Sequence, residues 1–320
     1  MATIVDVAKK AGVSCQTVSR VINNSTNVSE KTRKKVLEVI NELDFCPNDL
    51  ARALKTSKSK TVGFIISDPN NPFYINIAIS LQHKLDECGY SLVILFSNED
   101  PDNQDKCFEY MFQKCVDMIL FTPTSPTAHL AERLKSRNVR AIQLFRNIVN
   151  DVNYIVADDE YGTYKATKYL LENHHEKMML IVGPYETENN RKRGFIRALK
   201  EFKIEFNDNM FVELTGNDEQ QETALSKKIK EYKPTAMIPV SMPVEQITLQ
   251  VLKKNDITIG KDVSVIFYDD NEIAKLLNIT CIAHDIEEIS EIIKNHLLND
   301  VDVDLKVAPF LKIRDSVKNI

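Results

Sequence analysis

The sequence predicts an α/β protein with a small helical head and a larger body built from doubly wound parallel sheets. Two observations indicate this fold class. Short helical patterns with capping residues fill the first part of the chain, and from residue 61 onward short β-rich runs alternate with amphipathic stretches. The 320 residues are 43% hydrophobic and 27% charged, which is typical of a globular protein with about two to three domains.

The first two helical patterns are joined by a glycine turn. Thr3 is a capping residue, and the apolar pattern that follows it ends at Gly12, a residue suited to the left-handed position after a helix. Ser14 caps the second pattern, whose apolar residues begin at Val18. A helix, a tight turn and a second capped helix make a helix-turn-helix, and a third helix capped by Ser29 completes a small three-helix domain.

The polar residues of the second helix suit a contact with DNA. In a helix-turn-helix, the N-terminal part of this helix enters the major groove and presents side chains to base edges. Gln bonds adenine bidentately and Arg bonds guanine in the same way, so Gln16 and Arg20 are candidate base-reading residues. Further candidate DNA contacts in the head are Thr3, Ser14, Cys15, Thr17, Ser19 and Asn23. The alternative is that these side chains only face water.

The charge distribution separates the head from the body. Residues 1–60 contain eleven Lys and Arg against six Asp and Glu, a net charge of +5. The remaining residues contain 30 Lys and Arg against 40 Asp and Glu, a net charge of −10. A basic head on an acidic body suits a protein whose head alone meets a polyanion.

Residue usage argues against several other classes of protein. The six cysteines are scattered without a CxxC pair, which predicts reduced thiols in a cytoplasmic protein and no metal site. No GxGxxG or Walker pattern occurs among the eight glycines, so no cofactor is expected. No apolar run approaches the roughly 18 residues of a membrane span, and the N-terminal residues lack a signal-peptide pattern, so no membrane partner is expected.

Residues 47–60 connect the head and the body. Pro47 ends the third helix, and "PNDLARAL" has the pattern of a short helix that is too short to be stable alone in water. The following "KTSKSK" is a basic joint. Folding of this segment on DNA would explain both features, and Leu54 would then be an apolar wedge for the minor groove. A plain linker explains the segment equally well.

From residue 61 the chain alternates strands and helices. The runs "TVGFIIS", "SLVILFS", "MILFTP" and "AIQLF" are apolar throughout, like strands buried on both faces of a parallel sheet, and segments 72–88, 101–115 and 127–137 show helical periodicity. A second series begins at "YIVAD" and continues through "MMLIVGP", "MFVELT", "AMIPV" and "VSVIFYDD". Two series imply two doubly wound subdomains, with a ligand between them at the carboxyl ends of the strands.

The sequence resembles the lac repressor (LacI/GalR) family of bacterial transcription regulators. The resemblance rests on "TIVDVAKKAGVSCQTVSRVINNSTNVSEKTRKKVLEVINELDFCPNDLARALKTSKSKTVGF", on "DPNNPFY" near residue 70 and on "NHHEKMMLIVGP" near residue 180, so it covers nearly the whole chain. It implies a hinge helix and a body like that of periplasmic binding proteins. It places Cys15, Gln16 and Arg20 at base-reading positions, and it places Ala51 and Leu54 on the DNA-binding hinge, with Leu54 intercalating.

The resemblance and the element pattern together predict three regions. These are a helix-turn-helix DNA-binding domain at 1–46, a hinge helix and linker at 47–60, and an effector-binding and dimerisation body at 61–320. Within the body, the N-subdomain is expected at about 61–158 plus 286–320, and the C-subdomain at about 159–285.

Side chains at the strand ends are the candidates for binding an effector. Arg donates through a fork and Asp accepts, so the two together suit vicinal hydroxyls, and an aromatic ring suits the face of a sugar. The candidate residues are Phe73, Tyr74, Asn98, Thr122, Arg146, Arg191, Ser241 and Asp269. The resemblance places Arg191 and Asp269 where relatives hold sugar or purine ligands. Each of these side chains has the alternative of a surface ion pair or a helix-end contact.

One departure from the family affects the prediction of the effector. Most relatives carry Asn-Asp after the strand "AMIPV", whereas this chain has Ser241-Met242. This wall of the pocket should therefore be less polar. The departure leaves open an alternative in which a partner protein or a sugar phosphate controls the regulator and the sugar pocket is degenerate.

Two rivals come from other classes of protein. A sugar-binding transport protein would have a similar body, but the basic head argues against it. An enzyme finds little support, because adjacent residues such as His174 and His175 point in different directions on a helix and no serine lies in GxSxG. A structural role is expected for His175.

The expected function is transcriptional repression without catalysis. The head binds double-stranded, pseudo-palindromic operator DNA, which requires a homodimer because each half-site meets its own recognition helix. A small-molecule effector, a sugar such as a pentose, is expected to bind between the body subdomains and to control the affinity for the operator. The favoured mechanism is that the bound sugar releases the repressor from DNA. The chain ends in "PFLKIRDSVKNI" without a leucine-heptad tail, so a dimer rather than a tetramer is expected.

Overall fold

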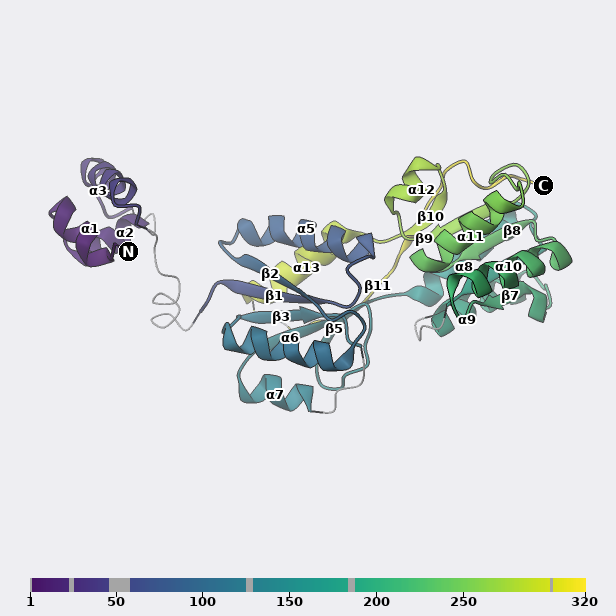
Figure 1. Cartoon of the computed structure of the whole chain (residues 1–320), viewed down its shortest axis with the longest axis horizontal. Coiled ribbons are helices and arrows are strands. Elements are labelled where there is room, and N and C mark those ends of the chain that lie inside the picture. The colour runs from purple at the N-terminus through teal and green to yellow at the C-terminus, as the bar shows by residue number, and fades with distance from the viewer. Residues whose placement is uncertain (1, 23–25, 46–57, 125–128, 184–187, 300–301) are drawn as a thin grey trace. The chain divides into compact units, whose positions relative to one another are not determined.

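The computed structural model divides into two compact units, residues 1–59 and residues 60–320, which are the head and the body. Figure 1 shows both, coloured along the chain. The structure describes residues 2–22, 26–45, 58–124, 129–183, 188–299 and 302–320. Among these residues, no helix has the length and apolarity that crossing a membrane requires.

The head is a three-helix domain, which confirms the predicted helix-turn-helix. Its helices are α1 (Ile4–Ala11), α2 (Cys15–Ile22) and α3 (Glu30–Glu42). Thr3 and Asp6 form a capping box at the start of α1, and Gly12 ends this helix with a φ of 68°, where glycine is favoured because it has no Cβ. At the start of α2, Ser14 Oγ accepts a hydrogen bond from the Thr17 amide at 3.1 Å.

The core of the head draws on all three helices. It consists of Val7, Ala8, Ala11, Val18, Val21, Val36 and Val39. Leu37, which belongs to the apolar pattern of the third helix, is 45% exposed. Val39 lies in the core because residues three apart on a helix share a face, and Val36 already faces the core.

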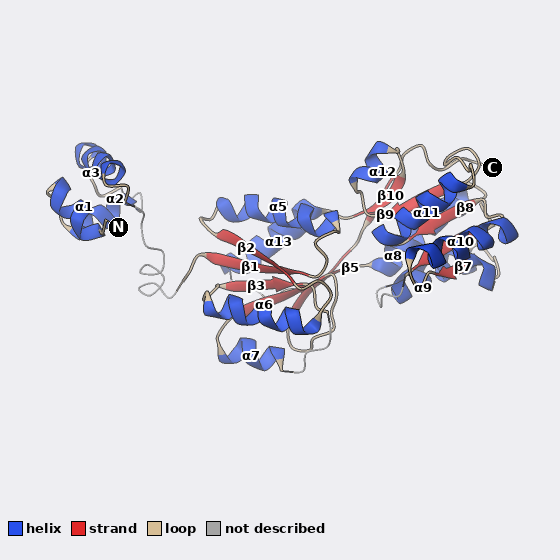
Figure 2. Cartoon of the chain, in the orientation of Figure 1, coloured by secondary structure: helices blue, strands red, loops and turns tan. Residues whose placement is uncertain are grey.

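The body contains two six-stranded sheets covered by helices (Figure 2). In the first sheet the strand order is β11-β5-β4-β3-β1-β2, and every pair is parallel. Its strands are β1 (Thr61–Ile66), β2 (Ser91–Phe96), β3 (Met118–Phe121), β4 (Arg140–Leu144), β5 (Asn153–Ala157) and β11 (Asp304–Val307). The helices of this first subdomain are α5 (Pro72–Asp86), α6 (Pro101–Gln113), α7 (Leu130–Ser136) and α13 (Ile286–Asn299).

The second sheet has the order β12-β10-β9-β8-β6-β7, and it is parallel except for the antiparallel pair of β10 and β12. Its strands are β6 (Met178–Val182), β7 (Phe211–Glu213), β8 (Ala236–Pro239), β9 (Ser264–Tyr268), β10 (Thr280–Ala283) and β12 (Phe310–Lys312). The helices of this second subdomain are α8 (Asp159–Glu172), α9 (Glu188–Glu201), α10 (Asp218–Tyr232), α11 (Met242–Lys254) and α12 (Glu272–Leu276), with a 3-10 turn at Asp208–Met210.

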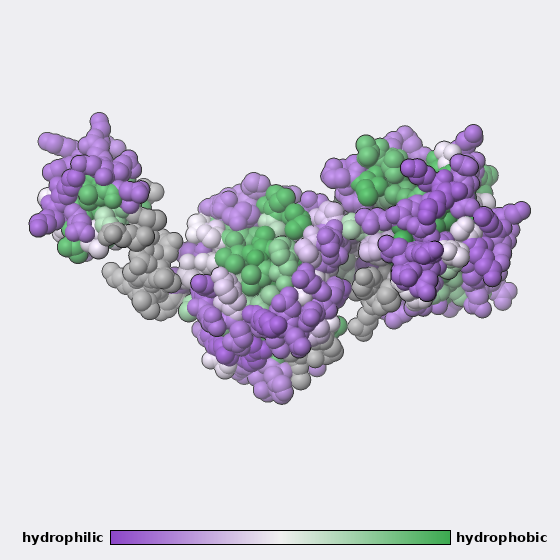
Figure 3. Space-filling model, in the orientation of Figure 1, coloured by the Kyte–Doolittle hydropathy of each residue, from purple (hydrophilic) through white to green (hydrophobic). Residues whose placement is uncertain are grey.

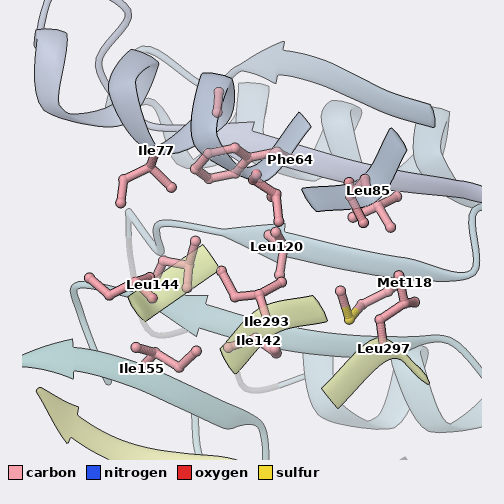
Figure 4. Packing of buried hydrophobic residues seen from close by; sticks show 14 of the residues in the cluster. Phe64, Ile77, Leu85, Met118, Leu120, Ile142, Leu144, Ile155, Ile293 and Leu297 are labelled. Atoms are coloured by element: carbon pink, nitrogen blue, oxygen red, sulfur yellow. The ribbon is translucent and has the colours of Figure 1, made fainter. Parts of the chain in front are cut away.

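The strands are apolar on both faces because successive side chains alternate and each face meets a layer of helices. In β1, Phe64 belongs to the core that contains α5 and α13, whereas its neighbour Ile65 belongs to the core that contains α6 and α7. Figure 4 shows the first of these cores, where Phe64 gathers with Ile77 of α5 and Ile293 of α13. The predicted sandwich of helices around each sheet is confirmed.

The second series of strands begins after "YIVAD", because β5 pairs with β4 and β11 in the first sheet. This run thus lies within the bounds of about 61–158 given above to the N-subdomain. The other predicted bounds of that subdomain are wrong, because residues 286–320 do not all belong to it. β12 pairs with β10, and Ser316 Oγ donates to the carbonyl oxygen of Val265 at 2.6 Å, so the chain from Phe310 onward completes the second subdomain. The chain therefore crosses between the sheets three times, after β5, β10 and β11.

His175 is buried at the junction between α8 and β6. Its Nε2 donates to the carbonyl oxygen of Lys318 at 2.9 Å, and its Nδ1 lies 2.9 Å from the Thr235 hydroxyl. Burial lowers the pKa of His175 below its usual value. The imidazole is therefore a neutral structural group that holds the last residues of the chain on the second subdomain.

Acid is expected to destabilise the body through His175. The folded protein binds a proton on this ring less readily than the unfolded chain, whose histidines titrate near pH 6.5. The contribution of His175 is therefore present above about pH 6.5 and is lost as the pH falls. Between pH 7.5 and pH 5.5, the Tm should fall more steeply for the wild type than for His175→Gln. The matched control is His174→Gln, because His174 is exposed, and equal slopes for wild type and His175→Gln would contradict this role.

Candidate functional site

The exposed face of α2 carries the side chains that the sequence predicts to meet DNA. Gln16 and Arg20 lie one turn apart on this face and are exposed, whereas Val18 and Val21 face the core. Thr3, Ser14 and Cys15 are also exposed, and Thr17 and Ser19 are half-buried. One face of the helix thus holds the head together, and the other presents polar groups to solvent.

Three predicted DNA contacts, Asn23, Ala51 and Leu54, lie outside the described residues, as does the hinge segment 46–57. Their roles remain predictions.

The body contains a cavity of about 110 Å³ whose walls come from both subdomains. Six of the eight predicted effector contacts line it, namely Phe73, Tyr74, Arg146, Arg191, Ser241 and Asp269. They follow β1, β4, β6, β8 and β9, so the carboxyl ends of the strands supply the site, as doubly wound sheets do. We refer to this site as the cleft cavity.

Two predicted contacts do not line the cleft cavity. After β2 the backbone takes a φ of 56° at both Asn98 and Glu99, and it is Glu99 that lines the cavity while Asn98 is exposed. Thr122 is fully buried at the end of β3, and its carbonyl oxygen accepts from Gln104 Nε2 at 2.9 Å. Both residues stand at the expected strand ends, but their side chains lie elsewhere.

Arg191 of α9 is central to the wall from the second subdomain. Its guanidinium donates to the carbonyl oxygen of Val240, approaches Asp159 Oδ1 at 3.4 Å and lies 3.8 Å from the ring centroid of Tyr268. The Tyr268 hydroxyl donates to the same oxygen of Asp159. Burial and then the charge on Asp159 raise the pKa of Tyr268 well above its usual value, so the phenol remains a hydrogen-bond donor.

Gly194 allows α9 to approach α8 closely. A Cβ at this position would lie 2.1 Å from the carbonyl oxygen of Glu160 and 2.8 Å from the amide nitrogen of Tyr164. Because both neighbours are backbone atoms of α8, no side chain fits between the helices. The close approach of the helices carries Arg191, which lies three residues before Gly194, to the N-terminal end of α8 where Asp159 lies.

On the first subdomain, Arg146 and Glu99 form a bidentate pair. Both terminal nitrogens of Arg146 lie 2.7 Å from a carboxylate oxygen of Glu99, and one of them also donates to the carbonyl oxygen of Pro123 at 3.1 Å. The two side chains are only 20% and 34% exposed. Such a fork is stronger than a single exposed ion pair, and it neutralises the charge of Arg146 within the cavity wall.

Asp269 and His284 face one another at the back of the cleft cavity. Asp269 follows β9 with a φ of 86°, and its Oδ1 lies 3.4 Å from His284 Nε2. His284 lies in the crossover between β10 and α13. Its ring centroid lies 5.3 Å from that of Phe73 and 5.9 Å from that of Tyr268, so this crossover residue contacts both subdomains.

Aromatic rings form the wall on the first subdomain. Phe73 lies 4.7 Å from Phe145 and 5.8 Å from Tyr74 between ring centroids. The start of α5 positions this wall, because Asn71 Oδ1 accepts from the Phe73 amide at 3.0 Å and Pro72 occupies the first turn. The cavity thus combines ring faces with charged and polar groups.

The Ser241-Met242 pair begins α11 and lines the cleft cavity. Ser241 occupies the N-cap position without making a side-chain cap bond, and its Oγ is buried without a hydrogen-bond partner among the described residues. A buried hydroxyl without a partner is costly, so a ligand that bonds it would relieve this cost. Met242 beside it supplies the apolar surface that the sequence predicts.

Glu245 lies behind the cavity and supports Asp269. It is 1% exposed, and it accepts hydrogen bonds from the Tyr268 amide at 2.9 Å and from Asn271 Nδ2 at 2.8 Å. Burial, followed by the charge on Asp269, raises the pKa of Glu245 well above its usual value. The carboxyl group fixes the turn between β9 and α12 on which Asp269 stands.

The eight predicted contacts omit several residues that line the cavity, among them Glu99, Phe145, Asp159 and His284. Glu99 and Phe145 each stand next to a predicted residue at the same strand end. Both have positive φ angles, 56° at Glu99 and 67° at Phe145, and nothing in the residue pattern signals those angles. The other two lie at the crossovers, where only the arrangement of the two sheets brings them together.

A helix-turn-helix head and a body of two doubly wound subdomains with a polar and aromatic cavity define a DNA-binding regulator with a ligand-binding body. Residues 3–48 match the family model of bacterial regulatory proteins of the lacI family. Residues 59–282, more than half of the chain, match the model of periplasmic binding proteins and the sugar binding domain of the LacI family. The chain belongs to the LacI family.

Individual relatives agree with this assignment. The chain is 31% identical over 296 residues to the HTH-type transcriptional regulator DegA of Bacillus subtilis strain 168, covering 90% of this chain and 88% of DegA. It is 31% identical over 335 residues to the HTH-type transcriptional repressor PurR of Vibrio vulnificus strain CMCP6, covering 100% of both. These relatives and the family models identify the chain as a DNA-binding transcriptional repressor with a ligand-binding domain.

Solved structures share the fold. The lac repressor dimer bound to operator and the anti-inducer ONPF has a TM-score of 0.80 and 24% identity over 99% of both chains. A periplasmic binding protein/LacI transcriptional regulator from Alkaliphilus metalliredigens QYMF, complexed with D-xylulofuranose, has a TM-score of 0.69 and 19% identity over 81% of this chain and 99% of that one. Members of the family are transcription regulators, not enzymes, and they bind operator DNA and small-molecule effectors and act as dimers.

Proposed function

We propose that a small sugar, such as a pentose, binds in the cleft cavity and controls the affinity of the repressor for its operator. The observation that carries this proposal is the convergence of Arg191, Asp159 and Asp269 with aromatic rings on one cavity between the subdomains. Guanidinium donors and carboxylate acceptors suit sugar hydroxyls, and ring faces suit the sugar carbons. The volume of about 110 Å³ is below the roughly 300–1,000 Å³ of most ligand pockets, which favours a compact ligand.

A sugar without a phosphate group is favoured over a sugar phosphate. Both arginines of the cavity are already paired with carboxylates, Arg146 with Glu99 and Arg191 with Asp159. A phosphate would need a cation or several free donors, and it would meet these carboxylates instead. A regulator of the same fold is complexed with D-xylulofuranose, and this supports a monosaccharide as the effector proposed here.

Two of the three crossovers between the sheets line the cavity. Ala157 and Asp159 lie at the first of them and His284 at the second. A sugar that binds one relative position of the subdomains more tightly than another shifts their equilibrium by this difference in affinity. A coupling of about 1–3 kcal/mol is typical for such allosteric regulation. Release of the operator by the bound sugar is the version that we favour.

In the head, Gln16 and Arg20 read the bases of the operator, while the other polar residues of the head position it on the phosphates. Gln16→Ala should weaken operator binding by about 1–3 kcal/mol and leave binding to random DNA unchanged, because only base readout is lost. The operator, selected from a random library by the wild type, serves for titrations by fluorescence anisotropy. Glu38→Ala is the matched control, since Glu38 is exposed on α3. An equal loss on random DNA would contradict base reading by Gln16.

The body supplies the interface of a homodimer. Exposed apolar side chains lie at Ile79 of α5 and at Ile94 and Phe96 of β2, with exposed fractions of 53%, 36% and 41%. Figure 3 shows a hydrophobic surface over β2, between α5 and α6. A pseudo-palindromic operator requires a two-fold dimer, and a second copy would cover this surface. Ile94→Asp should shift the sedimentation coefficient from dimer to monomer, whereas Phe202→Asp should not; a dimeric Ile94→Asp would exclude this interface.

A second candidate is a regulator of the same family that is controlled by a partner protein. The thioether of Met242 in the cavity wall favours it, because this position offers no acceptor to a sugar hydroxyl. The two candidates differ in their response to small molecules, since only the first requires an occupied cavity.

A thermal-shift screen with pentoses, hexoses, their phosphates and nucleosides tests the proposed function. A sugar that raises the Tm, that loses its effect in Asp269→Ala and that changes operator affinity would support control through the cleft cavity. No shift with any compound would favour the partner-protein candidate. If a sugar raised the Tm of Asp269→Ala as much as that of the wild type, the sugar would bind outside the cleft cavity.

A further inference from the structure

The cleft cavity carries more negative than positive side chains. Its carboxylates are Asp68, Glu99, Asp159 and Asp269, and its guanidinium groups are Arg146 and Arg191. Each arginine is paired with one carboxylate, Glu99 or Asp159. Within the described chain, Asp68 makes no ion pair, and Asp269 has only the ring of His284 beside it. Two carboxylates therefore remain without a guanidinium or ammonium partner of their own.

The orientation of His284 adds an acceptor to this region. Its side chain is only 4% exposed, and its Nε2 lies 3.4 Å from Asp269 Oδ1. A carboxylate oxygen at this distance favours the tautomer with the proton on Nε2, because a lone pair there would face a negative oxygen. The other nitrogen, Nδ1, is then an acceptor. It is buried and has no hydrogen-bond partner among the described residues, and the ring lines the cavity.

The negative charge of Asp269 affects the pKa of two neighbouring acids, Glu245 and Tyr268. Burial, followed by this charge, raises the pKa of Glu245 behind it. Asp269 also adds to the effects that raise the pKa of Tyr268, after burial and the charge on Asp159. The charge of Asp269 therefore raises the pKa of both neighbouring acids of the second subdomain.

The wall opposite suits an organic cation. The rings of Phe73 and Phe145 lie next to one another at 4.7 Å between centroids, and Phe73 lies 5.3 Å from His284. Aromatic faces attract cations through the ring quadrupole. On the other side of the cavity this attraction is already visible, because the guanidinium of Arg191 lies 3.8 Å from the ring centroid of Tyr268. Unpaired acceptors of the described residues and aromatic rings thus line the same cavity.

We propose that the effector carries an ammonium group, which donates to the Asp269 carboxylate beside the aromatic wall, so that the ligand class is an amino sugar. The inference rests on the proposed function, because it names the ligand class of the same cavity. An ammonium group supplies three donors and one positive charge. It would balance one of the two remaining carboxylates, while a hydroxyl of the same sugar donates to His284 Nδ1, which faces away from Asp269.

Matched sets of sugars test the charge of the effector. Each set holds a neutral hexose, its 2-amino form and its N-acetylated 2-amino form: glucose, glucosamine and N-acetylglucosamine, with the corresponding galactose and mannose compounds. In at least one set the amino form should bind about tenfold or more tightly than the other two, as titration calorimetry measures. Acetylation removes the charge but adds bulk, whereas the neutral hexose replaces the ammonium group by a hydroxyl of similar size, so the hexose separates charge from shape. Asp269→Asn should abolish the preference.

Asp270→Asn is the control variant. Asp270 is adjacent in sequence, but its carboxylate is paired with Lys312 and Arg314, so its loss should leave the preference for the amino form unchanged. Asn tolerates positive φ, so Asp269→Asn preserves the backbone at 269, where φ is 86°.

A measurement without ligand tests the charge surplus independently. Asp269→Asn should raise the Tm of the ligand-free protein, because it removes a charge that is only 16% exposed and has no guanidinium or ammonium partner, whereas Asp270→Asn should lower it by breaking two ion pairs. A fall of the Tm in Asp269→Asn as large as that in Asp270→Asn would overturn the inference whatever the ligand. Binding of a neutral sugar in preference to its amino form would overturn the inference and leave the proposed function intact. Failure of every neutral and amino sugar to bind would contradict the proposed function itself.

Discussion

Arg191→Ala is expected to abolish the response of the repressor to its effector while operator binding persists. The variant loses the donor fork and the cation over the Tyr268 ring, and it leaves Asp159 without its guanidinium partner. Charge-assisted hydrogen bonds contribute about 1.5–3 kcal/mol each, so effector affinity should fall by roughly 100-fold or more. Calorimetry of effector binding and anisotropy of operator binding measure the two properties separately.

Arg193→Ala is the matched control for this prediction. Arg193 lies on the same helix, but its side chain is 62% exposed and pairs with Glu160 at the surface. Surface ion pairs of this kind contribute about 0–1 kcal/mol, so the effector response should survive. If both variants lost the response equally, the cause would lie in helix α9 as a whole rather than in the cavity.

Gly194→Ala should destabilise the body through the contact between α8 and α9. By helix propensity alone, alanine would stabilise α9 by about 1 kcal/mol. The steric effect has the opposite sign and is larger, because the new Cβ would lie 2.1 Å from the carbonyl oxygen of Glu160. Backbone atoms cannot rotate away, so α8 and α9 must separate. The expected net loss is about 2–4 kcal/mol, which corresponds to a fall in Tm of roughly 5–15 °C for a domain of this size.

Gly89→Ala separates this steric effect from the general cost of replacing glycine. Gly89 has a φ of 69°, and a Cβ there would have no atom within 4 Å. Only backbone strain of about 1 kcal/mol is expected. Effector affinity should fall in Gly194→Ala, because Arg191 moves with α9, and should remain unchanged in Gly89→Ala. Similar Tm values for the two variants would show that α8 and α9 adapt without cost.

The helices of the head could be predicted because capping residues and a glycine turn mark their ends. The caps Thr3 and Ser14 and the turn at Gly12 act within a few residues of themselves, so the pattern alone indicates where α1 ends and α2 begins. The same holds for strands such as β1, whose apolar residues alternate between two cores. Strand ends were predictable for the same reason, and with them Arg191 and Asp269.

Longer-range order was not predictable in the same way. β12 has three residues, and its place beside β10 depends on pairs such as Cys281 with Lys312, which no local pattern encodes. His284 was missed because an ordinary residue after a strand becomes a cavity residue only when the two sheets face one another. Glu99 entered the cavity in place of Asn98 through backbone angles that apolar periodicity does not report.

The three crossovers also constrain how the chain is made. The first sheet needs β11, at Asp304–Val307, and the second needs β12, at Phe310–Lys312. During synthesis from the N-terminus, neither edge strand has left the ribosome until almost the entire chain has been translated. A nascent chain halted after β10 would expose an unpaired edge on β5 and another on β10, and such edges are templates for aggregation. No single cut in the body separates two complete subdomains, so translation must reach β11 before the first sheet is finished and β12 before the second is.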